Sequence, residues 1–142
     1  MLMMRASYAE ILRGKGYKVT PKRKAVLGIM RKYNRYFSPS EIWGRLKGKF
    51  DCLGLPSIYR ILEEFACAGI VTRIKRDDRQ LYYFLCDAAD CHHHHFICRQ
   101  CHCVSEVLAC HADLIYGYIE NELGCKAEAH FMQIEGLCAK CR

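Results

Sequence analysis

The first 91 residues of this 142-residue chain contain no histidine, and the first 85 contain only two of its eleven cysteines. The same 85 residues are poor in acidic side chains, with 7 Asp and Glu against 18 Lys and Arg, a net charge of +11. Residues 86–142 reverse the balance, with 4 Lys and Arg against 8 Asp and Glu, a net charge of −4. This asymmetry predicts a binder of polyanions joined to a binder of metal.

Long apolar runs are also missing from the sequence. No run of 18 apolar residues occurs, so we expect no membrane-spanning helix. The apolar residues 1–4 are too few for the core of a signal peptide, which indicates a cytoplasmic protein. Thiols stay reduced in that compartment, and eleven is an odd number, so we expect the cysteines to bind metal rather than to form disulfides.

Signatures of catalysis are absent as well. The sequence has no glycine-rich phosphate loop, no Gly-x-Ser-x-Gly elbow and no His-Glu-x-x-His motif. Cysteine together with histidine could form a thiol nucleophile or a catalytic metal site, but nothing else in the sequence supports either one. We therefore predict that the chain is not an enzyme. A zinc-dependent enzyme and a metal-storage protein are the alternatives from other classes, and neither needs a basic first half.

Metal ligands are concentrated in the ten-residue stretch 92–101, His-His-His-His-Phe-Ile-Cys-Arg-Gln-Cys. Its Cys98-x-x-Cys101 spacing lets two thiolates bind one tetrahedral ion, and Cys138-x-x-Cys141 repeats that spacing near the end of the chain. Two such pairs predict a structural Zn2+ site with four cysteine ligands. The 36 residues between the pairs would then be closed into one zinc-bridged subdomain.

The four consecutive histidines precede Cys98 on an expected strand. Side chains alternate between the two faces of a strand, so His93 and His95 would face one way, and His92 and His94 the other. One short segment could then serve two separate metal sites. Imidazole binds zinc, iron, nickel and copper alike, whereas a neighbouring thiolate favours zinc or copper over iron or manganese.

The basic part shows the elements of a winged helix-turn-helix. Helix-entry signals, apolar residues at helical spacing and a polar hairpin between two β-rich segments occur in that order. Ser38 and Glu41 have the spacing of a capping box, and the apolar residues of the fourth helix at helical spacing are Ile58, Ile61, Leu62 and Phe65. They predict helices at about 8–13, 21–33, 39–49 and 56–68, and strands at about 70–75 and 81–85. Helices followed by a two-stranded wing describe a winged helix-turn-helix whose helix 56–68 enters the major groove of DNA. Cys52 and Cys67 are expected to be core residues.

The second part is expected to be a small α/β unit. Its predicted elements are strands at about 95–98 and 103–107, a helix at about 111–123 and a last strand at about 125–135. These elements leave little apolar core, a deficit that zinc and dimerisation would offset. The whole chain is thus expected to be an α+β protein. Its parts are a winged-helix DNA-binding domain at 1–86, a hinge at 87–91 and a metal-binding dimerisation domain at 92–142.

Several ordered motifs run through nearly the whole chain. They are Gly16-Tyr17-Lys18-Val19-Thr20-Pro21-x-Arg23, Ser57-Ile58-Tyr59-Arg60-x-Leu62, the stretch 92–101 and Cys138-x-x-Cys141. In these motifs the chain resembles the ferric uptake regulator (Fur) family of bacterial metal-sensing repressors. The resemblance implies a homodimer that binds double-stranded DNA at an AT-rich palindromic operator when it is loaded with a divalent metal. Such a protein would repress genes of metal uptake or homeostasis.

The resemblance also implies roles for individual residues. The structural zinc ligands would be Cys98, Cys101, Cys138 and Cys141. The ligands of the regulatory metal would be His93, His95 and Glu106, with Cys86 or Asp87 as the ligand at the hinge. A second regulatory site, found in some members, would use His92, His94, Asp113 and His130. The positions at DNA would be Lys15, Arg23, Ser57, Tyr59 and Arg60, with Tyr59 at the bases and Arg60 at a phosphate.

Some positions depart from the family pattern. Tyr36 stands where iron- and peroxide-sensing members often place a histidine ligand. His94 replaces a frequent acidic residue, and His102 a frequent glycine. Extra cysteines near the expected sites are Cys91, Cys103 and Cys110. These departures leave the family resemblance intact and bear on the metal that is sensed.

The choice of regulatory metal depends on the ligand at the hinge. Cys86 and Cys91 favour Zn2+, because thiolates prefer zinc to iron or manganese. The carboxylates of Asp87 and Glu106 would favour Fe2+ or Mn2+ instead. We therefore expect a zinc sensor, with iron, peroxide or haem sensing as the alternatives.

Overall fold

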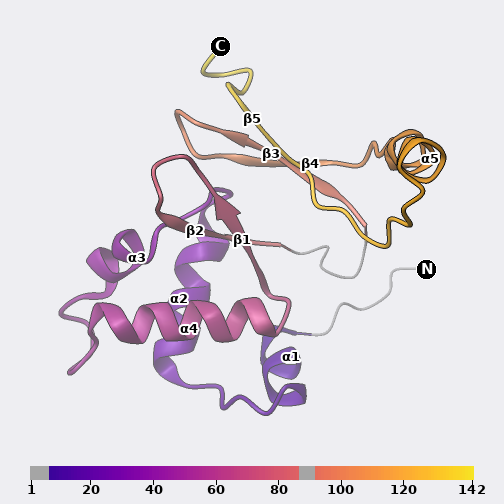
Figure 1. Cartoon of the computed structure of the whole chain (residues 1–142). Coiled ribbons are helices and arrows are strands. Elements are labelled where there is room, and N and C mark those ends of the chain that lie inside the picture. Colours follow the sequence, from indigo (N-terminus) through magenta and orange to yellow (C-terminus); the bar gives the residue numbers. More distant parts are fainter. Residues whose placement is uncertain (1–6, 87–91) are drawn as a thin grey trace, which may run out of the picture. The chain divides into compact units, whose positions relative to one another are not determined.

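The computed structural model describes residues 7–86 and 92–142 and has the mixed α+β fold that the sequence predicts (Figure 1). The chain forms two compact units, Met1–Ala89 and Asp90–Arg142, here called unit 1 and unit 2. The expected hinge at 87–91 lies outside the described residues. Among the described helices, none is both long and apolar enough to cross a membrane.

Unit 1 begins with four helices, α1 (Tyr8–Gly14), α2 (Pro21–Lys32), α3 (Pro39–Leu46) and α4 (Leu55–Cys67). The start of α3 is fixed by a capping box, the motif that its sequence predicted. The Glu41 N–H donates to the Ser38 hydroxyl, and the Glu41 carboxylate accepts from the Ser38 N–H. The helix ends three residues earlier than predicted, because Lys47 leaves the helical conformation and pairs with Phe50 in a β-bridge.

Helix α4 is held by its apolar side. Its buried residues are the four that the helical spacing predicted, Ile58, Ile61, Leu62 and Phe65. They join one core cluster with buried residues of α2 and α3. The expectation that Cys52 and Cys67 are core residues is wrong, since both are exposed. Cys52 lies in a turn with φ 58°, and Cys67 follows Phe65 by two positions, which points it away from the apolar side.

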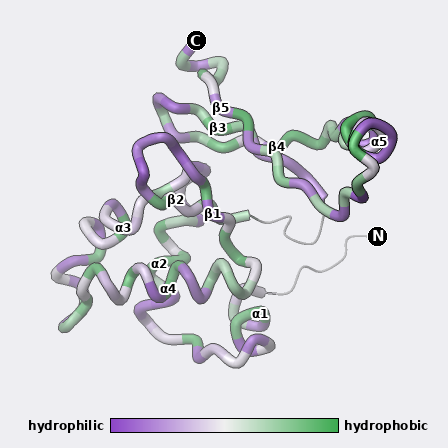
Figure 2. Tube along the Cα trace, in the orientation of Figure 1, coloured by the Kyte–Doolittle hydropathy of each residue, from purple (hydrophilic) through white to green (hydrophobic). Residues whose placement is uncertain are grey.

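The wing follows α4 as an antiparallel hairpin of β1 (Val71–Lys75) and β2 (Leu81–Leu85). Its tip is strongly hydrophilic, as Figure 2 shows by its purple colour. A third segment joins the hairpin where Phe37 and Tyr83 exchange two backbone hydrogen bonds of 2.9 and 2.8 Å. This bridge connects the wing to the segment that leads into α3.

A polar contact also connects the wing with α4. The Glu63 carboxylate of α4 accepts hydrogen bonds from the Arg73 guanidinium of β1 and from the buried Tyr83 hydroxyl of β2. The Arg73 hydrogen bond, followed by that of Tyr83, lowers the pKa of Glu63 below its ordinary value of 4.5. Burial, followed by the bond to Glu63, raises the pKa of Tyr83. Glu63 therefore links α4 to both strands of the wing.

Unit 2 contains a three-stranded sheet and one helix. Its elements are β3 (His94–Cys98), β4 (Val104–Val107), α5 (Ala112–Leu123) and β5 (Gln133–Gly136). The strand order is β4-β3-β5, with β3 antiparallel to β4 and parallel to β5. The prediction of a long last strand from residue 125 is wrong. Its only partner among the described residues is β3, which begins at His94, and the register pairs His95 with Gln133, so residues 125–131 have no partner strand.

We predict that Glu63→Gln lowers the free energy of unfolding of unit 1 by about 1 kcal/mol at neutral pH. The effect is this small because an exposed ion pair stabilises a fold less than a buried one does. Because the folded state lowers the pKa of Glu63, its stabilising contribution is complete above pH 4.5 and disappears as the pH falls through the folded value. Chemical unfolding of both proteins between pH 7 and 3 measures this difference. Asp51→Asn, at an exposed turn, is the control, and a difference that stays constant with pH would contradict the assignment.

Candidate metal centres and nucleic-acid interface

Strand β3 is the middle strand of its sheet, and the four histidines at and just before its start face in two directions. The Nε2 atoms of His93 and His95 lie 3.1 Å apart. On the other face, His94 Nε2 lies 3.2 Å from His130 Nε2, and the rings of His92 and His94 pack edge to face with centroids 4.8 Å apart. This separation follows from the alternation of side chains along a strand. Unit 2 thus holds two distinct histidine groups.

The first group consists of His93 and His95, with Glu106 on the adjacent strand. Glu106 is directly opposite His95 in the register of β3 and β4. Burial, followed by repulsion from His93, lowers the pKa of His95, whereas the Glu106 charge acts in the opposite direction. The neutral imidazole is the form that binds metal. The two histidines can therefore supply two nitrogen ligands, whereas Glu106 is not among the described residues whose donor atoms converge with theirs.

Of the three candidate hinge ligands, the structure describes Cys86. This residue directly follows β2, its side chain is buried, and its N–H donates to the Ile70 carbonyl at 3.2 Å. Asp87 and Cys91 lie outside the described residues. Unit 1 contains no histidine, and Cys86 is its last described residue.

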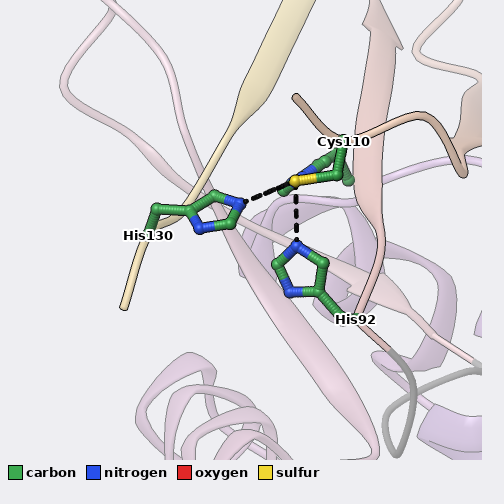
Figure 3. Close-up of side chains that lie close together, drawn as sticks. His92, Cys110 and His130 are labelled. Carbon is green, nitrogen blue, oxygen red and sulfur yellow. Dashed lines mark hydrogen bonds between the residues drawn. The ribbon is translucent and has the colours of Figure 1, made fainter. Parts of the chain in front are cut away.

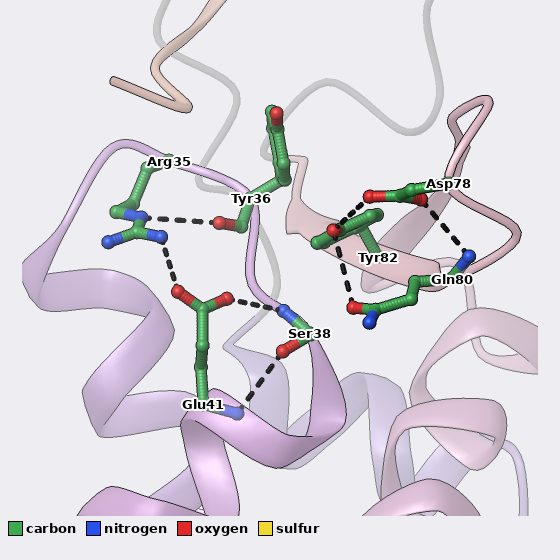
Figure 4. Close-up of polar contacts among 7 residues, drawn as sticks. All are labelled: Arg35, Tyr36, Ser38, Glu41, Asp78, Gln80 and Tyr82. Carbon is green, nitrogen blue, oxygen red and sulfur yellow. Dashed lines mark hydrogen bonds and ion pairs between the residues drawn. The ribbon is translucent and has the colours of Figure 1, made fainter. Parts of the chain in front are cut away.

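Tyr36 stands where the family pattern often has a histidine ligand (Figure 4). Its ring packs edge to face against Tyr82 of the wing, with centroids 5.0 Å apart. Arg35 donates from Nε to the Tyr36 carbonyl at 3.3 Å and forms an ion pair with Glu41 at 2.6 Å. The Tyr82 hydroxyl in turn donates to the Asp78 carboxylate at the hairpin tip. Tyr36 is thus part of the packing between the wing and the α3 entry.

The second group gathers His92, His94, Cys110 and His130, whose donor atoms all lie within 4.8 Å of one another. Figure 3 shows the Cys110 sulfur between two imidazoles, 3.3 Å from His92 Nε2 and 3.2 Å from His130 Nε2. Burial, followed by the charges of His92 and His130, lowers the pKa of His94. Asp113, which the resemblance implied as the fourth ligand here, lies exposed in the first turn of α5 and outside this group.

Five thiols gather beyond the end of β3. The sulfur atoms of Cys98, Cys101, Cys103 and Cys138 lie within 4.8 Å of one another. Hydrogen bonds from the backbone N–H groups of Cys101 and then Cys138 lower the pKa of Cys98 to about 6. The fifth thiol is that of Cys141, and its hydrogen bond with Cys138 raises its pKa to about 12. Soft metal ions bind cysteine as the thiolate, so a cluster of this kind can hold one by releasing the thiol protons.

Cys103 and Cys110 were expected only as extra cysteines near the sites. Cys103 joins the thiols because the antiparallel hairpin places it opposite Cys98, whose N–H donates to the Cys103 carbonyl at 2.9 Å. The Cys101-x-Cys103 spacing was a usable signal for this proximity. Cys110 lies between β4 and α5, eighteen residues from His92, and no local pattern indicated their contact.

The exposed side of α4 carries two of the residues expected at DNA. Tyr59 and Arg60 are exposed, and Ser57 is half-buried in the first turn. Lys15 is exposed at the end of α1. Because the opposite side of α4 is fully buried, the helix presents this polar side as a rigid surface. Such a helix, followed by a hydrophilic wing, can enter a DNA groove.

Arg23 is engaged within the protein. Its guanidinium forms an ion pair with Glu64 of α4 and donates to the Lys18 carbonyl at 2.8 Å. Its side chain is only 14% exposed. Arg23 therefore joins α2, α4 and the segment before α2, a role that sequence analysis did not foresee.

Comparison with known proteins agrees with these features. The family model described as the ferric uptake regulator family matches residues 14–135. The ferric uptake regulation protein of Bordetella parapertussis is 31% identical over 132 residues, covering 92% of this chain and 94% of the relative. The ferric uptake regulator of Francisella tularensis, solved with iron, has a TM-score of 0.66 at 30% identity, covering 89% of this chain and 95% of that one. A zinc uptake regulator solved with zinc and DNA has a TM-score of 0.71 at 25% identity, covering 92% and 87%.

The thiol cluster leads to a prediction about its fourth ligand. We expect Cys98→Ser and Cys141→Ser each to lose one zinc per chain, because paired knuckles hold a tetrahedral ion. Structural zinc contributes on the order of 10 kcal/mol of apparent binding energy, comparable to the stability of a small domain, so unit 2 should also unfold more readily. Cys103→Ser should keep its zinc and serves as the control. Elemental analysis measures the outcome, and loss of zinc in Cys103→Ser but not in Cys141→Ser would reverse the assignment.

Proposed function

Because the chain belongs to the ferric uptake regulator family, we propose that it is a zinc-responsive, DNA-binding repressor of genes for metal uptake or homeostasis. Membership of this family makes it a metal-responsive transcriptional regulator and not an enzyme. The observation that carries the proposal is the His93–His95 pair, two imidazoles 3.1 Å apart and separate from the thiol cluster. The pair offers a regulatory ion a place distinct from that of a structural ion.

Zinc is our choice for the regulatory ion because the chain pairs its histidines with sulfur. Cys86 or Cys91 would add a thiolate to His93 and His95, a donor set that prefers zinc to iron or manganese. Asp87 with Glu106 would instead provide carboxylates, which suit Fe2+ or Mn2+ and support iron or peroxide sensing as the second candidate. As a repressor the protein would act in the cytoplasm, where the chromosome lies.

Regulators of this family bind DNA as dimers, and we assign the same state to this chain. Unit 2 carries large apolar side chains that are mostly exposed, among them Leu114 at 77%, Tyr118 at 62% and Phe131 at 68%. An exposed apolar surface of this kind is typical of a protein–protein interface. A second copy of the chain would cover these residues, while Zn2+ at Cys98, Cys101, Cys138 and Cys141 stabilises the unit.

The partner of unit 1 would be double-stranded DNA with a palindromic, AT-rich operator. A two-fold dimer presents two copies of α4, so it matches two inverted half-sites. AT-rich sequences have a narrow, strongly negative minor groove that attracts lysine and arginine. Lys15 and the net charge of +11 over residues 1–85 suit this target.

The proposed switch acts through the hinge. Cys86 or Asp87 precedes residues 88–91, and His93, His95 and Glu106 follow them. A metal that binds ligands on both sides would hold the two units at one angle, so that both α4 helices reach one operator. A change in population from 1:99 to 99:1 requires a preference of about 5.5 kcal/mol for the bound form, which several metal–ligand bonds can supply.

We predict different effects for two neighbouring residues of α4. Arg60→Ala should weaken DNA binding on all sequences and reduce the salt dependence by about one phosphate contact. Tyr59→Ala should reduce discrimination between operator and non-operator DNA by about 1 kcal/mol, because a ring edge can contact thymine methyl groups. Binding titrations at several salt concentrations measure both, with Arg99→Ala in unit 2 as the control. Parent-like binding by both variants would exclude α4 as the recognition helix.

We also predict that the double variant His93→Ala, His95→Ala loses metal-induced DNA binding while it keeps structural zinc and the dimer. The reason is that it removes two nitrogen ligands and leaves the thiol cluster intact. DNA binding titrated with Zn2+, together with the zinc content and mass of the variant, measures the effect. His111→Ala, an exposed histidine outside both groups, is the control. Metal-dependent DNA binding by the double variant would refute the hinge mechanism.

A further inference from the structure

Cys110 stands in the second histidine group, where the family resemblance implied Asp113. We propose that His92, His94, Cys110 and His130 form a tetrahedral Zn2+ site in which the Cys110 thiolate replaces the Asp113 carboxylate. This proposal rests on the proposed function only insofar as unit 2 is the metal-binding unit. It replaces the fourth ligand that the resemblance implied for this site and gives the site a metal preference.

Three of the six separations among the four donor atoms are close to those of a zinc coordination sphere, and all six are within 4.8 Å. The separations are 3.3 Å from His92 Nε2 to Cys110 Sγ, 3.2 Å from that sulfur to His130 Nε2, and 3.2 Å from there to His94 Nε2. With Zn–N about 2.05 Å and Zn–S about 2.3 Å, a regular tetrahedron has edges of about 3.3–3.6 Å. The observed separations are close to these edges. A zinc ion can therefore bind all four atoms after small shifts of the side chains.

Hydrogen bonds alone account poorly for this convergence. His130 Nε2 faces the Cys110 sulfur and His94 Nε2 at the same 3.2 Å. A neutral imidazole nitrogen has either one proton or one lone pair, so it cannot satisfy both neighbours. A cation among the four atoms accepts a lone pair from each of them. It thereby stabilises the arrangement of the whole group.

Tyr116 supports His130 from outside the group. Its hydroxyl lies 2.7 Å from His130 Nδ1. When Nδ1–H donates to the phenol oxygen, the lone pair of Nε2 points toward Cys110 and His94. A hydrogen bond on the outer nitrogen is the usual way in which a protein orients a metal-binding histidine. Tyr116 is thus a positioning residue for the site.

The site would connect three segments of unit 2. His92 and His94 lie at the start of β3, Cys110 lies between β4 and α5, and His130 lies between α5 and β5. Zinc would fix both connections of α5, including residues 124–132, which form no strand. Since α5 carries much of the apolar surface that we assign to the dimer, zinc here should strengthen dimerisation.

The chemistry of the donors determines the metal. Three imidazoles suit several metals, and the thiolate favours Zn2+ or copper over Fe2+ and Mn2+. Asp113 has an explanation that requires no metal, because a carboxylate in the first turn of a helix is stabilised by the helix dipole. Experiments on Cys110 and Asp113 can therefore decide which of the two residues is the fourth ligand.

The test uses the full-length protein and counts zinc in competition with a chelator. Cys110→Ser should lower the zinc affinity of one site per chain by at least about 100-fold. Even the mutation of a residue that only hydrogen-bonds to a metal ligand typically lowers metal affinity by about 10–100-fold. Asp113→Asn and Cys125→Ser, the latter an exposed thiol beyond α5, should retain parent-like zinc content. With Co2+, Cys110→Ser should lose the ultraviolet charge-transfer absorption of one thiolate. Cys110→Asp should shift the preference of this site toward Mn2+. Circular dichroism checks that each variant folds.

Two results would overturn the proposal. One is unchanged zinc content and cobalt absorption in Cys110→Ser. The other is loss of this zinc in Asp113→Asn with retention in Cys110→Ser. These measurements need no DNA, so they are independent of whether zinc controls operator binding. If the variants have the expected zinc content but DNA binding does not depend on zinc, the metal site is supported and the proposed function is wrong.

Discussion

The alternation of side chains along β3 is the constraint on which the metal chemistry of this protein depends. Because neighbouring residues point to opposite faces, four consecutive histidines are divided into two groups within about four residue lengths. The same strand ends at Cys98 and so leads directly into the thiol cluster. A helix would spread these side chains around its axis and could not divide them between two faces. Three sets of ligands thus depend on one short strand.

The two units use different sources of stability. Nearly all of the large buried apolar side chains belong to unit 1, and the described part of unit 2 contributes few, among them Ile97 and Val104. A core of that size is marginal for an independent fold, and metal or a partner chain is the usual supplement. The ligands of unit 2 therefore suit two tasks, holding the fold and responding to metal. Unit 1, without histidine, has an ordinary core that keeps α4 and the wing rigid.

Local sequence patterns predicted the helices and the wing well, because caps and apolar spacing act over few residues. The buried side of α4 was predicted residue by residue, and the capping box at Ser38 fixed the start of α3. The last strand was predicted too long, since its length depends on a partner strand far away in the sequence. The contact of Cys110 with His92 and His130 was missed for the same reason. When a segment contributes a single residue to a site, as here with Cys110, no local sequence pattern indicates which distant residues it contacts.

The central claim is that zinc acts at sites other than the thiol cluster to control DNA binding. The most direct test adds zinc stepwise to full-length protein that carries one structural zinc per chain, and follows the fluorescence anisotropy of a labelled AT-rich palindromic duplex. Control by zinc predicts little binding at the start, a sharp rise as further zinc binds, and reversal by a chelator that leaves the structural zinc in place. Equal DNA binding before and after the zinc addition, or a rise with Fe2+ or Mn2+ but not with Zn2+, would contradict it.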